Sequence, residues 1–267
     1  MLFTYKTGEP TAPAIVFLHG GGLSGRQWQP QMERLPDYYC LAPDLPEQGK
    51  SLHIGPFRLE DAAKRVIDLI DAQVPSKRAH LVGLSLGADL ALAITQIAPA
   101  FVDHVMVSAA APLSKVFGKV VLALSTLPIN FLYLEKQCKL AAKRLGVPEV
   151  YRAMFCEDLL LAVNLTSTRH FIEALIELPQ WLPYEAEVPI LVTVGEQESL
   201  IAKQAAKKVL ASLKRAQGIM IPGVNHVWNL QAPDLFTDIV RAWIEDRPPD
   251  VLQSLMTVHS RTGGKSQ

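Results

Sequence analysis

The chain has 267 residues, of which 49% are hydrophobic, so it can bury one large core with or without an insertion. Its 26 basic residues equal its 26 acidic residues, which argues against a nucleic-acid-binding surface. The start, Met1 to Lys6, lacks the features of a signal peptide, and the longest apolar run, Val120 to Leu134, is interrupted by Pro128 and too short to cross a bilayer. We therefore expect a cytoplasmic protein with no membrane partner.

The first predicted strand is Ala14–Leu18, a continuous apolar run rich in β-branched and aromatic residues. It leads into His19, which we expect to be structural, and then into three successive glycines, Gly20 to Gly22. Glycines let the backbone approach a bound group closely, so their N–H groups can stabilise a negative oxygen. A flexible connection is the alternative interpretation.

Strands and helices then alternate along the chain. An amphipathic stripe predicts a surface helix at Leu59–Ala72. This alternation predicts parallel strands joined by right-handed crossovers. His19–Gly22, Asp44 and Ser85 each follow a predicted strand, so they should gather at one edge of the sheet. The further strands predicted in this half are Tyr39–Ala42, Ala79–Val82 and Val102–Val107, and a further helix is Ala88–Ala98.

Gly83 to Gly87 reads G-x-S-x-G, with Ser85 at its centre. An apolar strand precedes it and a run of good helix formers follows it. A sharp turn between strand and helix would expose the serine oxygen beside free N–H groups at the start of the helix. Ser85 is therefore a candidate nucleophile. A plain serine that caps the helix is the alternative.

The rhythm changes between residues 113 and 183, where no strand is evident. We interpret this segment as an all-helical cap inserted into the α/β core, between core parts 1–112 and 184–247, with residues 248–267 as a loose tail. An apolar roof would suit an apolar substrate, although the helices could simply pack on one another. The helices predicted in the cap are Lys115–Leu127, Phe131–Leu145, Pro148–Phe155, Leu159–Leu165 and Thr168–Leu178.

The second core part carries the other candidate residues. The strand Val188–Val194 leads into Glu196 and Glu198, and the strand Gly218–Ile221 leads into His226. The chain order is thus serine, acid, histidine. An imidazole can take the proton of a serine hydroxyl, and a carboxylate can hold the other imidazole N–H. The helices predicted around these strands are Ile201–Leu213 and Asp234–Glu245.

Together these motifs resemble the α/β-hydrolase superfamily over nearly the whole chain except the tail. The resemblance implies an α/β fold with a mostly parallel sheet of about seven to eight strands, helices on both faces and a helical cap. The residues that carry it are His19–Gly22, Pro43–Leu45, Gly83–Gly87, Gly195–Glu198 and Gly223–His226.

The resemblance also assigns roles by position. It implies Ser85 as nucleophile, His226 as base, and the N–H groups of Leu86 and Gly21 as oxyanion donors, with Gly22 as a close alternative. The acid would be Glu198, which stands where the family usually has aspartate, and Glu196 is the alternative. Residues 108–111 offer no carboxylate, which favours Glu198.

Asp89 follows Ser85 by one helical turn, and we expect it to face solvent or to complement the helix dipole. The cysteines Cys40, Cys138 and Cys156 are odd in number and lack metal spacing, so we expect reduced, buried thiols. No nucleotide, flavin or metal motif occurs, and no lysine-serine pair follows Gly22 as a phosphate loop requires. We therefore expect no metal, no cofactor and a small-molecule substrate.

A serine nucleophile selects acyl chemistry. Family members that open epoxides or remove halides use aspartate at this position, so Ser85 argues against both reactions. The first expectation is a hydrolase of the carboxylesterase type that acts on a small, mainly apolar ester. The alternatives are a carbon–carbon bond hydrolase, a perhydrolase or a lyase on the same residues, and a non-catalytic small-molecule binding protein.

Overall fold

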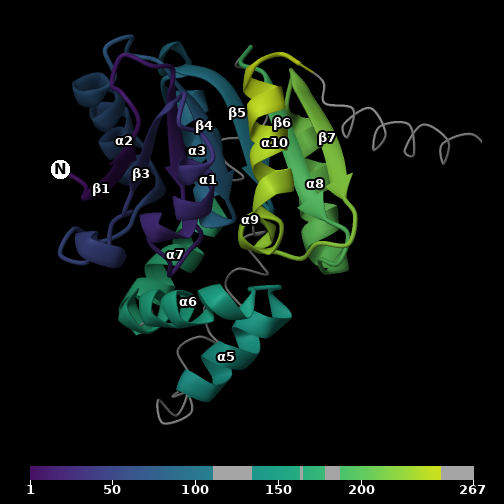
Figure 1. The fold of residues 1–267 in the computed structure, drawn as a ribbon. Coiled ribbons are helices and arrows are strands. Elements are labelled where there is room, and N and C mark those ends of the chain that lie inside the picture. The colour runs from purple at the N-terminus through teal and green to yellow at the C-terminus, as the bar shows by residue number, and fades with distance from the viewer. Residues whose placement is uncertain (111–133, 163–164, 178–186, 248–267) are drawn as a thin grey trace, which may run out of the picture.

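The computed structural model describes residues 1–110, 134–162, 165–177 and 187–247, and they form an α/β core with a helical cap (Figure 1). One sheet has the strand order β1-β3-β2-β4-β5-β6-β7. Neighbouring strands are parallel except β1, which pairs antiparallel with β3. The strands are β1 (Thr4–Thr7), β2 (Ala14–Leu18), β3 (Tyr39–Pro43), β4 (Ala79–Leu84), β5 (Val102–Ser108), β6 (Ile190–Gly195) and β7 (Ala216–Ile221).

Helices cover both faces of the sheet, as predicted. One face packs against α2, α3 and α8, and the other against α1 and α10. The core helices are α1 (Gln29–Glu33), α2 (Leu59–Gln73), α3 (Leu86–Ile97), α8 (Leu200–Ser212), α9 (Trp228–Gln231) and α10 (Pro233–Ile244), with short 3-10 turns η1 (Gly25–Trp28), η2 (Gly49–Ser51) and η3 (Pro99–Phe101).

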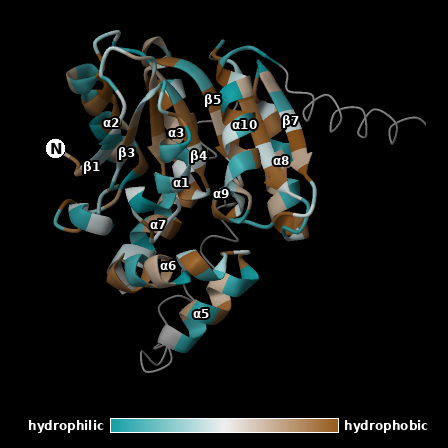
Figure 2. Cartoon of the chain, viewed as in Figure 1, coloured by the Kyte–Doolittle hydropathy of each residue, from teal (hydrophilic) through white to brown (hydrophobic). Residues whose placement is uncertain are grey.

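The central strands are buried on both sides, which explains their continuous apolar sequence. In β2, Val16 and Leu18 pack toward the face of α2, α3 and α8, whereas Ile15 and Phe17 pack toward α1 and α10. Successive side chains of a strand point to opposite faces, so both sets must be apolar when both faces are covered. Figure 2 shows the hydrophobic colour concentrated on the strands and on the sides of the helices that meet them.

The strand β1 was missed by the sequence reading. Its four residues, TYKT, are half-buried or exposed, because β1 is an edge strand whose pairing with β3 supplies its conformation. A segment this short and polar has no periodic pattern of its own. The predicted fold class is confirmed, with seven strands in the described part of the chain.

Within its described residues the cap contains α5 (Leu134–Arg144), α6 (Glu149–Ala162) and α7 (Leu165–Glu177), which lie together beyond one end of the sheet near α9 (Figure 1). The helices predicted at Pro148–Phe155 and Leu159–Leu165 are wrong as separate elements, since α6 is continuous from Glu149 to Ala162 and Leu165 already belongs to α7. No glycine or proline interrupts residues 149–162. The predicted helix Lys115–Leu127 and the tail lie outside the described residues.

The expectation of three reduced thiols is also wrong. Cys138 of α5 and Cys156 of α6 form a disulfide, and Cys40 alone remains a free, buried thiol. Burial raises the pKa of the Cys40 thiol to about 12, so it is unreactive. The spacing of the cysteines could not reveal the pair, because α5 and α6 become neighbours only when the cap folds.

Candidate active site

Ser85 lies at the sharp turn between β4 and α3. Its backbone has φ 54° and ψ −119°, in a region of positive φ that residues with side chains rarely adopt. The Ser85 N–H donates to the carbonyl of Ser108 at 2.9 Å, and the Ser85 carbonyl accepts from the N–H groups of Ala88 and Asp89. Strain of this kind persists only where the surroundings enforce it, and it clusters at functional sites.

Two glycines make this turn possible. A Cβ on Gly83 would lie 2.3 Å from the carbonyl oxygen of Gly87, and a Cβ on Gly87 would lie 2.0 Å from the carbonyl oxygen of Leu18. Both contacts are with backbone atoms, which cannot rotate aside as a side chain can. The G-x-S-x-G spacing is therefore required by the close approach of α3 to the ends of β4 and β2.

The glycine loop, residues 20–24, follows β2 and lies beside Ser85. The N–H of Gly22 donates to Oε1 of Gln48 at 2.6 Å, and the N–H of Gly20 donates to Oε1 of Gln27 at 3.0 Å. Among the described residues the N–H of Gly21 has no hydrogen-bond partner. The geometry thus favours Gly21 over Gly22 as a donor to an external oxygen.

The helix start supplies a second free donor. The helix α3 begins at Leu86, so the Leu86 N–H has no acceptor within the helix. A Cβ on Gly21 would lie 3.5 Å from the Leu86 side chain, which places the two residues next to each other. The backbones of Leu86 and Gly21 therefore lie close together at the start of α3, and their role as oxyanion donors stays a prediction.

His226 and Glu198 form a hydrogen-bonded pair. Nδ1 of His226 lies 2.9 Å from Oε2 of Glu198, whose side chain is only 4% exposed. A carboxylate acceptor beside Nδ1 favours the imidazole tautomer with its proton on Nδ1, in which Nε2 is the acceptor. Glu196 instead accepts from the N–H of Gly223 at 2.9 Å. The two candidate acids therefore have different partners, and only Glu198 holds the imidazole.

The serine turn and the histidine loop are joined through the end of β5. Ser108 is the last residue of that strand; its carbonyl accepts from the Ser85 N–H, and its hydroxyl accepts from Nε1 of Trp228 at 2.7 Å. Trp228 follows His226 by two residues. Within the described chain no hydrogen bond joins the Ser85 hydroxyl to His226. Such bonds are often long in the unliganded state and tighten when substrate binds.

His19 is structural, as expected. Its Nδ1 lies 2.9 Å from the carbonyl of Gly20, and its Nε2 accepts from the N–H of Leu45 at 2.9 Å. Both ring nitrogens are thereby used inside the core. Complete burial lowers the pKa of His19, so the ring is neutral at physiological pH. It fixes the glycine loop against the segment after β3.

Asp89 does not face solvent, so that half of the expectation is wrong, whereas its place in the first turn of α3 fits the alternative that it complements the helix dipole. It is fully buried in the first turn of α3, on a helix whose other residues from Leu86 to Thr95 are also buried. The helix packs against both the sheet and α2, and this tertiary position is not visible in the local sequence.

A cavity of about 550 Å³ borders the histidine loop. Its lining includes His226, Glu198 and Arg144, together with the apolar side chains of Leu145 and Ile201. It lies where α5 of the cap, the start of α8 and the turn after β7 meet. The cavity therefore borders the His226–Glu198 pair, and its lining does not include Ser85.

A side-chain contact that the sequence did not reveal joins the cap to the core. Nδ1 of His170 on α7 lies 2.9 Å from Oε2 of Glu47, which also accepts from the N–H of Phe57. Residues 170 and 47 are far apart in sequence, and no local pattern indicates their pairing.

Neither a metal site nor a single membrane-spanning helix is found in the described ranges. No group of three histidine, cysteine, aspartate or glutamate residues there could hold an ion. No single helix there is long and apolar enough to cross a membrane, and a bent pair, Glu149–Ala162 with Ser167–Ile176, passes by length and composition only.

Residues 15–239 match the model of the Alpha/beta hydrolase family. An AB hydrolase superfamily protein of Gibberella zeae is 26% identical over 90% of this chain and 83% of its own length. The pimeloyl-[acyl-carrier protein] methyl ester esterase of Pectobacterium atrosepticum is 26% identical over 86% of this chain and 94% of its own length. The crystal structure of the enol-lactonase from Burkholderia xenovorans superposes with a TM-score of 0.76 at 19% identity, covering 91% of this chain and 96% of that one.

Proposed function

The chain belongs to the Alpha/beta hydrolase family, and on that premise we propose that it is a serine hydrolase that cleaves a small, mainly apolar ester through an acyl-enzyme on Ser85. The observation that carries the proposal is the turn conformation of Ser85, enforced by Gly83 and Gly87 beside two free N–H groups. The pairing of His226 with Glu198 supplies a base whose tautomer is set.

In the proposed reaction His226 acts first as a base and then as an acid, both when the acyl-enzyme forms and when it is hydrolysed. Nε2 of His226 takes the hydroxyl proton of Ser85 as the serine oxygen attacks the ester carbonyl. The carbonyl oxygen becomes negative and accepts hydrogen bonds from the N–H groups of Leu86 and Gly21. His226 then protonates the leaving alcohol, and Glu198 stabilises the imidazolium. Water attacks the acyl-enzyme by the same route and releases the acid.

The substrate class rests on the cap and on the cavity beside His226. Leu145 and Ile201 give the cavity an apolar wall, and it adjoins the group that would protonate the leaving alcohol. The names of the relatives agree with ester chemistry, since one is a methyl ester esterase and the fold neighbour is a lactonase.

The substitution Ser85→Ala tests the nucleophile directly. We expect it to abolish turnover of p-nitrophenyl esters and labelling by a fluorophosphonate probe while the fold is kept. A chain-length series on the wild type would then size the acyl pocket. Undiminished turnover by Ser85→Ala would exclude the assignment, and a folded wild type that neither turns over nor labels would support the non-catalytic binding alternative.

Two matched substitutions test the acid. In Glu198→Gln, the amide oxygen can still accept from Nδ1 of His226 but carries no charge that stabilises the imidazolium. If the amide N–H₂ faces Nδ1 instead, the ring is held in the tautomer whose Nε2 cannot act as a base. We therefore expect kcat to fall by about 10- to 10⁴-fold. Glu196→Gln keeps an oxygen for the N–H of Gly223, so we expect a change within about twofold. Equal losses, or the reverse order, would move the acid role away from Glu198.

A further inference from the structure

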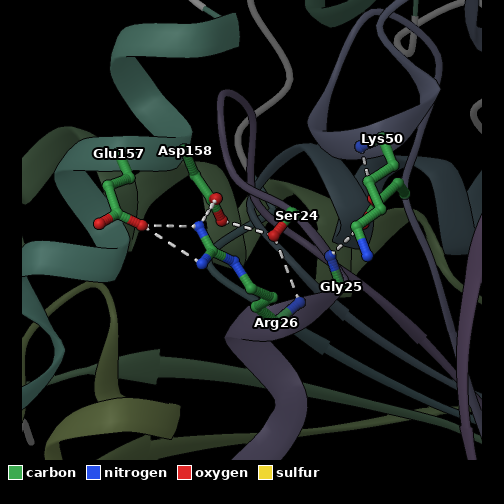
Figure 3. A network of polar contacts seen from close by, with 7 residues as sticks. Ser24, Gly25, Arg26, Lys50, Glu157 and Asp158 are labelled. Atoms are coloured by element: carbon green, nitrogen blue, oxygen red, sulfur yellow. Dashed lines mark hydrogen bonds and ion pairs between the residues drawn. The ribbon is translucent and has the colours of Figure 1, made fainter.

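A buried carboxylate of the cap reaches into the core beside the glycine loop (Figure 3). Asp158 on α6 is 3% exposed, its Oδ2 accepts from the hydroxyl of Ser24 at 2.5 Å, and its Oδ1 pairs with the guanidinium of Arg26. A charge taken out of water is stable only in good geometry with its partners. The position of α6 and the position of residues 24–26 therefore depend on each other.

Ser24 is the last residue of the glycine loop and the N-cap of η1. Its hydroxyl oxygen accepts from the N–H of Arg26 at 3.3 Å while the hydroxyl proton is donated to Asp158. The next N–H, that of Gly25, donates to Oδ1 of the buried Asp44 at 2.7 Å. Residues 24 to 26 are thus held by these three hydrogen bonds, and the cap supplies the acceptor of one of them, Asp158.

Residues 20 to 23 of the glycine loop connect β2 to Ser24. Gly20 and Gly22 donate to side chains of the core, and the N–H of Leu23 donates to the carbonyl of Gly20 at 3.1 Å, which closes a turn around Gly21. A shift at Ser24 passes through this turn to Gly21, because only Gly22 and Leu23 stand between them.

The same cap helices also support the histidine loop. Leu23 of the glycine loop, Phe155 of α6 and Val227 belong to one apolar cluster, and the N–H of Val227 donates to the carbonyl of Leu145 at 3.1 Å. Val227 directly follows His226. The contacts of Asp158 are therefore the polar part of a junction at which the cap meets both loops of the site.

We propose that Asp158 is a positioning residue that sets the oxyanion donor Gly21 by holding Ser24 and Arg26 against the cap. The proposal rests on the proposed function, because it assigns the glycine loop a role in stabilising the oxyanion. Full activity then requires that α6 packs against the core in the position in which Asp158 contacts Ser24 and Arg26. A cap helix thereby contributes to catalysis without a contact to the substrate.

The test compares Asp158→Asn with Glu157→Gln. Both residues pair with Arg26, but Glu157 is exposed, so Glu157→Gln should change kcat by no more than about twofold. Asp158→Asn should lower kcat for p-nitrophenyl esters by about 10- to 100-fold, because a displacement of about 1 Å in a catalytic group has an effect of that order. KM should change by less than about threefold if the ground state makes no use of the oxyanion donors.

A second readout separates positioning from stability. An alkyl boronic acid, which mimics the tetrahedral intermediate, should bind Asp158→Asn more weakly by about the factor by which kcat falls. Ser24→Ala, which removes a single hydroxyl, should give a loss in the same direction, and the double variant should lose less than the product of the two factors.

The outcomes are distinct. Wild-type kcat and boronic acid affinity in folded Asp158→Asn or Ser24→Ala would overturn the proposal, and so would equal losses in Glu157→Gln. If Asp158→Asn does not fold, Ser24→Ala with the boronic acid decides the question alone. Turnover retained by Ser85→Ala would remove the proposed function itself, whereas an inactive Ser85→Ala beside a fully active Asp158→Asn would remove only the role of Asp158.

Discussion

Substitution of Gly87 by alanine should damage the site more than any other glycine change beside Ser85. The new Cβ would lie 2.0 Å from the carbonyl oxygen of Leu18, whereas real Cβ atoms essentially never approach a neighbour within 3.0 Å. The difference, 3.0 − 2.0, means that α3 or the end of β2 must move by about 1 Å. Overpacking of this kind costs about 1–3 kcal/mol of stability.

A displacement of the end of β2 by the new methyl group should also lower activity. Leu18 is the last residue of β2 and lies opposite Gly83 in the register with β4, so its movement shifts the glycine loop relative to Ser85. We expect kcat to fall by about 100-fold, since a shift of about 1 Å at the reacting groups has that effect. The assays are p-nitrophenyl ester hydrolysis and thermal unfolding followed by circular dichroism.

Gly20→Ala is the matched control in the same region. A Cβ there would make only ordinary contacts, at 3.5 Å to the Leu84 side chain and 3.6 Å to the Leu23 side chain, and the N–H of residue 20 would be kept. We expect its stability to change by less than about 0.5 kcal/mol. If Gly87→Ala matched the wild type in both kcat and midpoint temperature, the steric account of the turn would be refuted.

Three further predictions concern stability. Burial, and next repulsion from His104, lowers the pKa of His80 from 6.5 to about 4. Between these pH values the unfolded chain binds more protons than the folded chain, so the free energy of unfolding should fall by about 3 kcal/mol from pH 6.5 to pH 4. This dependence on pH should be weaker in His80→Gln than in His53→Gln, which changes an exposed histidine as the control. The disulfide Cys138–Cys156 joins residues 18 positions apart and should contribute about 3 kcal/mol to the free energy of unfolding. A thiol reductant should therefore lower the midpoint temperature of thermal unfolding of the wild type but not that of the double variant Cys138→Ser, Cys156→Ser. Asp44→Ala leaves the N–H groups of residues 25 and 50 without their acceptor and should cost about 3 kcal/mol in urea unfolding, whereas a loss below about 1 kcal/mol would contradict that role.

The sequence determined the order of the strands β2 to β7 and the positions of the candidate nucleophile and base after them. Short apolar runs rich in β-branched residues, such as Ala14–Leu18 and Ile190–Gly195, favour strands buried on both faces, and the alternation with amphipathic helices predicts parallel pairing. Parallel strands end at one edge, so the residues that follow them meet there. This reasoning needs only local pattern and chain order, which is why it succeeded.

The tertiary structure decided which group meets which. Glu196 and Glu198 lie two residues apart on the same turn, and only the path of the chain around Gly223 gives one the backbone N–H and the other the imidazole. The N–H of Gly22 donates to Gln48, which lies 26 residues further along the chain, whereas the N–H of Gly21 has no partner among the described residues. The family pattern favours Glu198 and Gly21 by position, but the local sequence does not reveal the partners that separate them from Glu196 and Gly22.

The cap shows the same limit most clearly. The disulfide between α5 and α6, the pairing of His170 with Glu47 and the burial of Asp158 each join segments that approach only after the chain has folded back on itself. A carboxylate on a helix is ordinarily exposed, and its burial requires partners that are specific to one packing. Local propensity sets which elements form, whereas the contacts between distant side chains set which of them make a site.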